Sequence, residues 1–261
     1  MYFLYPACIY IRFDCFCCET MSSSKPILLS IEGNIGAGKT TLLRHLKSVF
    51  SNAEMDDATS YLDKPVVFME EPVDLWESVR DAETGESILS KFYRDKETYA
   101  FAFQVMAYTS RLELFKRTIS ENPGCKVIVC ERSLEADRHI FAKMLYDEGA
   151  IDSVSYQVYE MLFKNTSWEF EIDLAVYLDA DPAKCIERIE GRGREGEAGI
   201  LPIEYLAKCK QYHDTWITHM CEHTEKTVVH IDANVDTAYD TKEDIGTQWV
   251  ELVQTLVQSF L

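Results

Sequence analysis

The sequence has few positive charges and no long apolar segment. Its 26 Lys and Arg residues stand against 44 Asp and Glu residues, which gives a formal net charge of −18 over 261 residues. Affinity for nucleic acid depends on clustered Lys and Arg, so this balance excludes a protein that wraps nucleic acid. No apolar run reaches the ~20 residues of a membrane span, so we expect no membrane segment. Any phosphate must be bound in a local site that overcomes the overall field.

The chain also lacks internal repeats and long linkers, which favours a single domain. Residues 1–20 differ from the rest, because they are apolar, aromatic and rich in cysteine without the basic start of a signal peptide. We interpret residues 1–24 as an N-terminal extension, either a disordered tail or a misassigned start before Met21, and residues 25–261 as the folded domain. Five of the nine cysteines are scattered through predicted strands and helices. This pattern favours a reducing, intracellular compartment, with the cytoplasm ahead of the mitochondrion.

Short apolar runs alternate with longer segments of helical periodicity. Strands are predicted at 26–32, 65–70, 126–131, 172–179 and 227–231. Helices are predicted at 40–50, 97–120, 134–146, 154–164, 182–190, 202–223 and 243–260. The strands are nearly continuous in Val, Ile and Leu, as strands buried on both faces are. This order predicts an α/β domain with a parallel sheet flanked by helices. The charged, glycine-rich segment at 190–199 predicts a mobile lid.

One motif carries clear chemistry. The stretch GNIGAGKT at 33–40 matches GxxxxGK[ST] and lies between a predicted strand and a predicted helix. Its backbone N–H groups and the helix N-terminus can surround a phosphate. Lys39 is expected to reach the β- and γ-phosphates, and the Thr40 hydroxyl to bind Mg²⁺. The predicted phosphate-binding residues are Gly33, Asn34, Ile35, Gly36, Ala37, Gly38, Lys39, Thr40 and Thr41. The motif therefore predicts a nucleoside triphosphate with Mg²⁺.

Such loops also occur in GTPases and ATPase motors, and the rest of the chain argues against both. A GTPase needs an NKxD-type guanine reader, which the sequence lacks. A motor usually has a hydrophobic strand that ends in Asp, whereas the nearest segment here, VIVCERS at 127–133, ends in Glu-Arg-Ser.

Five motifs in order resemble one family. They are IEGNIGAGKTT at 31–41, EEPVDLW at 70–76, YRDKETYAFAFQVMAYTSR at 93–111, CERSLEADRHIFA at 130–142 and RGREGE at 192–197. Together they resemble the deoxyribonucleoside kinases of the deoxycytidine/deoxyguanosine kinase type. The resemblance implies a P-loop kinase fold with a five-stranded parallel sheet and a short arginine-rich lid. It also implies ATP-dependent phosphorylation of the 5′-hydroxyl of deoxyribonucleosides in nucleotide salvage, and a homodimer.

The resemblance implies three catalytic residues, Glu71, Arg132 and Lys39. Glu71 would be the general base for the 5′-hydroxyl, which suits a carboxylate at the end of a strand. Its neighbour Glu70 should face the other way, because successive side chains of a strand alternate. Arg132 would contact the 5′-oxygen and the transferring phosphoryl group. Glu131 would join Thr40 in binding Mg²⁺, partly through water.

The resemblance also implies a substrate pocket and a lid. The remaining substrate-binding residues would be Trp76, Tyr93, Phe103, Gln104, Arg111, Asp137 and Glu197, in addition to Glu71 and Arg132. Arginines of the lid and residues near the last strand would bind ATP, namely Arg188, Arg192, Arg194, Asp232 and Asn234. The lid departs from the family pattern, because Glu-Gly-Glu at 195–197 replaces two consecutive acids.

Three positions separate base preferences in the family, and here they are Ala107, Arg111 and Asp137. An Arg–Asp pair matches members that favour deoxycytidine and purine deoxynucleosides over thymidine. The alternatives are a thymidine or pyrimidine deoxynucleoside kinase, a thymidylate-type kinase and a non-catalytic nucleotide-binding module. The last of these should have lost Lys39, Glu71 or Arg132, and all three are present.

Overall fold

The computed structural model describes residues 25–54, 64–192 and 201–261. The expected extension at 1–24 and the predicted site residues Arg194 and Glu197 lie outside the described residues. A five-stranded sheet runs through the centre in the order β2-β3-β1-β4-β5, and every neighbouring pair is parallel. The predicted α/β fold is thereby confirmed. The strands are β1 (Ile27–Gly33), β2 (Val66–Met69), β3 (Val127–Glu131), β4 (Leu174–Asp179) and β5 (Thr227–Asp232).

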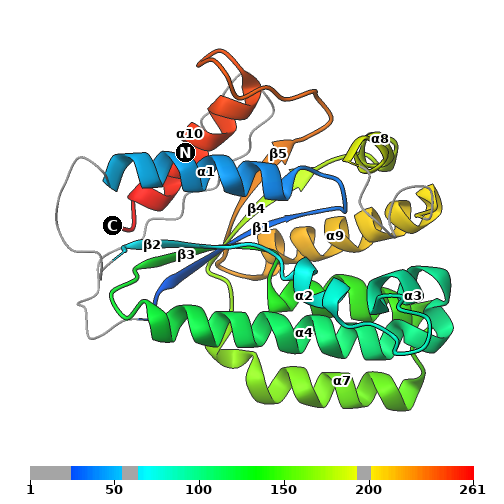
Figure 1. Ribbon diagram of the computed structural model, residues 1–261. Helices are drawn as coiled ribbons and strands as arrows, with labels where there is room; N and C mark the ends of the chain where they lie inside the picture. The colour runs from blue at the N-terminus through cyan, green and yellow to red at the C-terminus, as the bar shows by residue number, and fades with distance from the viewer. Residues whose placement is uncertain (1–24, 55–63, 193–200) are drawn as a thin grey trace.

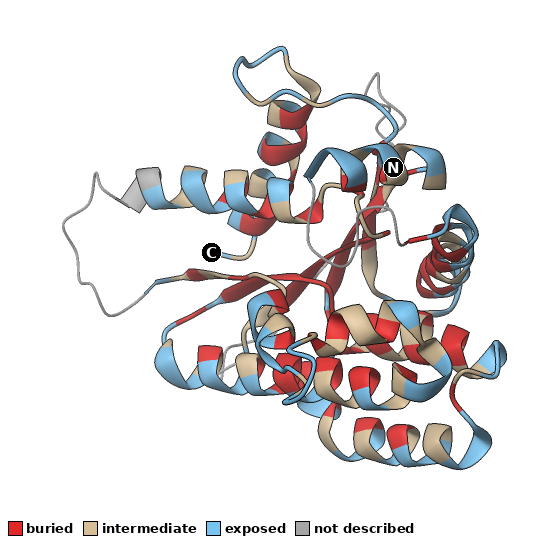
Figure 2. Cartoon of the chain, turned by 45° about the vertical axis from the view of Figure 1, so that its right-hand side comes forward, coloured by how far each residue is buried: buried red, intermediate tan, exposed pale blue. Residues whose placement is uncertain are grey.

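The apolar residues of these segments explain why they form a central sheet. All five residues of β3 are buried, and the strands are largely red in Figure 2. Leu29 of β1 stands opposite Val129 of β3 on one side and Leu174 of β4 on the other. Because all strands are parallel, their carboxyl ends meet at one edge, where ligands of open α/β sheets bind.

Helices cover both faces of the sheet. In Figure 1, α1 and α10 lie on one face, and α4 lies on the other with α7 outside it. The α-helices are α1 (Lys39–Glu54), α2 (Val73–Ser78), α3 (Ile88–Arg94), α4 (Lys96–Glu121), α5 (Leu134–Ala136), α6 (Lys143–Asp147), α7 (Ser153–Thr166), α8 (Pro182–Arg192), α9 (Ile203–His223) and α10 (Ile245–Gln258). Within the described ranges, no helix combines the length and the apolar character that crossing a bilayer requires.

The structure differs from the sequence prediction around the site. The short helices α2 and α3 were not predicted, because six or seven residues carry little helical periodicity and depend on tertiary packing. The single helix predicted at 134–146 is interrupted by a π-helical turn at Asp137–Ala142. Such turns often mark functional sites, and here the turn places the buried Asp137 against α4.

A third apolar cluster lies beyond the two faces of the sheet. It joins α2, α3, α4 and α6 through Val73, Trp76, Leu89, Phe92, Ala100, Phe103, Ala107, Leu145 and Ile151. Its aromatic side chains face the carboxyl edge of the sheet, and they form one wall of the cavity described next.

Candidate active site

A cavity of about 820 Å³ lies at the carboxyl edge of the sheet, between the 33–40 loop and the third apolar cluster. It brings together most of the predicted residues from distant parts of the chain. The predicted residues that line it are Ile35, Gly36, Ala37, Gly38, Lys39, Thr40, Thr41, Glu71, Trp76, Tyr93, Phe103, Gln104, Glu131, Arg132, Asp137, Arg188 and Arg192. Five predicted residues are described but do not line it, namely Gly33, Asn34, Arg111, Asp232 and Asn234.

The 33–40 loop owes its shape to glycine at two close contacts. Gly33 and Gly36 have φ of 144° and 81°, and a Cβ on Gly36 would lie 2.7 Å from the carbonyl oxygen of Cys185. Only glycine combines easy access to a positive φ with the absence of a Cβ. Asn34 braces the loop from behind, because its Nδ2 donates to the Leu206 carbonyl at 2.8 Å and its Oδ1 accepts from the Ile35 N–H at 2.9 Å.

Lys39 provides a positive charge at the end of this loop. Its side chain is buried, and its Nζ donates to the carbonyl oxygen of Asn34 at 2.8 Å. Burial, and then the positive charge of Arg132, lower the pKa of Lys39 to about 8. A buried ammonium group that faces the cavity is suited to bind an anion, because an incoming phosphate replaces the hydration that the group has lost.

Glu71 lies at the centre of a charge cluster. Its Oε1 accepts from Arg111 Nη2 at 2.9 Å and lies 3.2 Å from Arg132 Nε. Burial alone would raise the pKa of Glu71, but Arg132, Arg111 and Lys39 outweigh it and lower the pKa to about 2. Glu70 was expected to face away from the cavity, but it lines the cavity as Glu71 does, and its Oε2 pairs with Arg44 Nη2 of α1 at 3.0 Å. Strand alternation does not separate the two residues, because β2 ends at Met69.

Arg111 holds three parts of the site together rather than lining the cavity. Its Nε donates to Asp137 Oδ2 at 2.9 Å, and its Nη1 donates to the backbone oxygen of Glu131 at 2.8 Å. With the bond from Nη2 to Glu71, the guanidinium links β3, the π-helical turn and the end of β2. The expected Arg111–Asp137 pair is present, and it also fixes the carboxylate of Glu71.

Thr40 and Glu131 form an oxygen-rich corner beside Lys39. The Thr40 hydroxyl donates to Glu131 Oε1 at 2.7 Å, and both residues line the cavity. Hydroxyl and carboxylate oxygens are the hard ligands that Mg²⁺ takes, usually with waters and substrate phosphates. The chemistry of this donor set therefore fits Mg²⁺.

Aromatic side chains form the opposite wall. The Phe103 ring stacks on Phe92, with centroids 4.6 Å apart, and meets Trp76 edge-on at 5.6 Å. Trp76 is fixed by a bond from Nε1 to Ser110 Oγ at 2.9 Å. Gln104 is buried beside them, and its Oε1 has no hydrogen-bond partner among the described residues. A buried amide oxygen without a partner at a cavity wall indicates a polar ligand.

Asp232 and Asn234, which were expected to bind ATP, do not line the cavity. Asp232 and Asn234 bond to each other, and Asn234 Oδ1 accepts from the N–H of Asp181, so they shape the turn. Thr237 and Tyr239, which lie later in the same segment between β5 and α10, line the cavity instead. Arg188 donates from Nη1 to the Ala37 carbonyl at 3.3 Å and from Nη2 to the Val235 carbonyl at 2.8 Å, which joins the two loops.

Some residues that line the cavity were not predicted, although they lie inside or beside the motifs found in the sequence. Phe92 and Phe141 line the cavity, and each lies next to or inside a motif of the resemblance, which was the available signal. Two buried polar groups were also not predicted, namely Glu32, which lies inside the first motif, and His213, which lies outside all five motifs. Glu32 precedes the phosphate loop, and His213 is one of three histidines on α9, of which His219 is exposed.

Comparison with known proteins agrees with this geometry. The sequence model described as deoxynucleoside kinase matches residues 29–254. The chain is 30% identical to deoxycytidine kinase of Rattus norvegicus over 92% of its own length and 97% of the relative. It is 32% identical to deoxycytidine kinase 1 of Xenopus laevis over 76% of each chain. It is 30% identical to mitochondrial deoxyguanosine kinase of Xenopus laevis over 73% and 72%. The chain belongs to the deoxynucleoside kinase family.

Proposed function

We propose that this kinase transfers the γ-phosphoryl group of ATP to the 5′-hydroxyl of deoxyribonucleosides, with deoxycytidine and purine deoxynucleosides as preferred substrates. One observation carries the proposal: a single cavity joins a phosphate-binding loop, a carboxylate between two arginines and an aromatic wall with a buried amide. The loop suits the donor phosphates, and the wall suits a nucleobase. We assign this activity to the whole unit from 25 to 261.

Glu71 is proposed to orient the 5′-hydroxyl and to take its proton. A carboxylate whose pKa is lowered to about 2 is a weak base. It therefore accepts a hydrogen bond from the hydroxyl in the ground state and receives the proton only as the new P–O bond forms. Arg132 and Lys39 provide positive charge where negative charge spreads over the phosphoryl oxygens.

Thr40 and Glu131 are proposed to hold Mg²⁺, Glu131 partly through water. When bound, the ion would neutralise charge on the donor phosphates. Arg188 and Arg192 of α8 line the cavity and are proposed to act as lid arginines that contact the donor phosphates. Arg194 and Glu197 are proposed as lid residues on the resemblance alone.

The base preference is proposed from the buried Arg111–Asp137 pair and Gln104. The pair is proposed to limit the space for a larger base substituent, because Asp137 lines the cavity together with Ala107 of α4. An amide offers both a donor and an acceptor, so Gln104 can pair with the edge of cytosine or of a purine. The two relatives named deoxycytidine kinase and the one named deoxyguanosine kinase support this preference. Discrimination by one methyl-sized group is worth only ~1–3 kcal/mol.

The test is a phosphorylation panel with ATP, Mg²⁺ and each of the four deoxynucleosides. Deoxycytidine or a purine deoxynucleoside is expected to give the highest kcat/KM, and Glu71→Gln is expected to be nearly inactive. A highest kcat/KM with thymidine would overturn the base assignment but keep the activity. Binding of ATP without phosphorylation of any nucleoside would favour the non-catalytic module.

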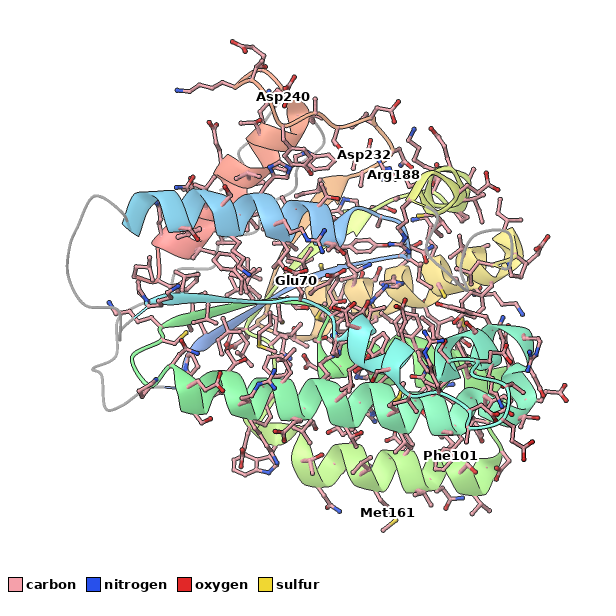
Figure 3. All side chains as sticks on the ribbon, viewed as in Figure 1. Glu70, Phe101, Met161, Arg188, Asp232 and Asp240 are labelled. Carbon is pink, nitrogen blue, oxygen red and sulfur yellow. The ribbon has the colours of Figure 1, made fainter. Side chains whose placement is uncertain are left out.

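A homodimer is proposed through the outer surface of α7. Val154, Val158 and Met161 on this helix are 69%, 49% and 64% exposed, and Trp168 just after it is 68% exposed. Met161 points away from the rest of the molecule in Figure 3. A row of exposed apolar side chains at helical spacing suits a second helix. Light scattering is expected to give the mass of two chains, and Met161→Glu to give one.

The compartment is proposed to be intracellular. Four cysteines of the described chain, Cys125, Cys130, Cys185 and Cys209, are buried thiols outside any disulfide. Such thiols suit a reducing compartment, the cytoplasm or the mitochondrion. Imaging of a tagged full-length chain is the direct test.

A further inference from the structure

His213 is a buried histidine with a fixed tautomer. It lies on α9 with none of its surface exposed. Its Nδ1 is 2.6 Å from the backbone oxygen of Cys209, one helical turn earlier. A carbonyl oxygen only accepts hydrogen bonds, so Nδ1 must carry the proton. This leaves Nε2 as a lone-pair acceptor if the ring is neutral.

Nε2 of His213 faces the side chain of Arg132. Arg132 Nη1 lies 3.3 Å from it, and an arginine stays charged at every pH of interest. If the imidazole were protonated, its Nε2–H and an N–H of Arg132 would face each other as two donors in a buried site. Burial, and then the charge of Arg132, hold the pKa of His213 well below its usual value. The ring is thus a neutral acceptor.

Arg132 itself occupies an unusual backbone position. Its φ is 63°, in the left-handed region that side chains other than glycine rarely adopt. Its N–H donates to the Ile31 carbonyl at 3.1 Å, and its guanidinium lies over the Phe141 ring at 4.8 Å. Nε faces Glu71 at 3.2 Å and Nη1 faces His213, so each contact orients a different edge of the guanidinium.

The groups packed around His213 support it without competing for Nε2. The Tyr177 ring stacks against the imidazole, with centroids 6.0 Å apart, and the Phe141 ring meets it edge-on at 6.2 Å. The hydroxyl of Tyr177 donates to Asp214 Oδ1 at 2.7 Å rather than to the histidine. The acceptor nitrogen is thereby left to Arg132.

We propose that His213 is a positioning residue that aims Arg132 at the transferring phosphoryl group, through a neutral imidazole with its proton on Nδ1. This inference rests on the proposed function, because it takes Arg132 to act in catalysis. His213 does not line the cavity. It acts by holding the guanidinium against Glu71 and Phe141 in the geometry that the reaction needs.

Two amide variants separate the acceptor from the rest of the ring. His213→Gln places an amide near the position of Nε2 and can still accept from Arg132. His213→Asn reaches only the position of Nδ1, so it keeps the donor to Cys209 and loses the acceptor. We expect His213→Asn to lower kcat about 10- to 100-fold with little change in either KM, and His213→Gln to retain most of the activity. His219→Asn, exposed on the same helix, is the matched control.

A double-variant comparison distinguishes the inference from the proposed function. On an Arg132→Ala background, His213→Asn is expected to cost little further kcat, because its partner is already gone. Equal losses on both backgrounds, or full activity of His213→Asn alone, would overturn the positioning assignment. If Arg132→Ala itself keeps full activity, the proposed role of Arg132 is wrong.

A measurement on the unaltered protein covers the case in which a variant does not fold. Nitrogen-15 NMR of the imidazole is expected to show a neutral ring protonated on Nδ1 throughout the range in which the enzyme is active. A ring protonated on Nε2, or a charged ring, would contradict the proposal directly.

Discussion

Glu32 gives the sharpest stability prediction. It lies on β1 directly before the phosphate loop, with none of its surface exposed. The hydroxyls of Ser30 and Ser133 donate to its Oε1 at 2.5 and 2.8 Å, while Oε2 has no partner among the described residues. Burial raises the pKa of Glu32 to about 7, although both serines and Arg132 act in the opposite direction. The folded protein therefore holds a proton here that the unfolded chain releases.

The magnitude follows from proton linkage. Between the unfolded pKa of 4.5 and the folded value of about 7, the folded state binds more protons. Stability from this group is then fully present below the lower value and is lost as pH rises through the upper one. A shift of this size corresponds to about 3 kcal/mol in total, of which about 2 kcal/mol falls between about pH 5.5 and about pH 8.

The perturbation is Glu32→Gln, which resembles the protonated acid and cannot ionise. Urea unfolding at several pH values is the assay. The free energy of unfolding of the variant minus that of the wild type is expected to increase by about 2 kcal/mol from about pH 5.5 to about pH 8. Glu113→Gln, exposed on α4, should show no such slope. A difference that stays flat, or that falls with pH, would show that Glu32 does not hold this proton in the folded state.

Three further predictions concern the site. Glu71→Gln is expected to lower kcat about 10²- to 10⁴-fold while ATP still binds, because the proposed proton acceptor is gone; unchanged steady-state kcat would contradict this. Gly36→Ala is expected to cost about 1–3 kcal/mol of stability, because its φ is 81° and the new Cβ meets a carbonyl of α8. Gly191→Ala, a helical glycine in open space, should instead stabilise by up to about 1 kcal/mol, and equal melting shifts would sink the argument. Asp137→Asn is expected to lower the free energy of unfolding by about 3 kcal/mol, because Arg111 keeps its buried charge with only one of its two carboxylate partners; urea unfolding with an unchanged midpoint would exclude this.

Features that depend on neighbouring residues could be predicted before the fold was known. The order of apolar runs and helical segments was enough for the parallel sheet and its flanking helices. The 33–40 motif was enough for the phosphate loop, because a positive φ and a close backbone approach admit only glycine at Gly33 and Gly36. The resemblance identified most residues of the cavity. These inferences depend on neighbours along the chain, where spacing fixes geometry.

Most contacts between residues far apart along the chain became visible only in the fold. Arg111 bonds to Glu71 and Asp137 across 40 and 26 positions of the chain, and Arg132 faces His213 across 81. No periodicity encodes such contacts. The short helices α2 and α3 form because burying their side chains in the third apolar cluster outweighs weak local preference. The π-helical turn buries Ile140 and Ala142 in a different cluster, to which α4 and α7 also contribute. Buried polar groups such as Glu32 become meaningful only when the fold removes their water, since desolvation sets both their charge and their partners.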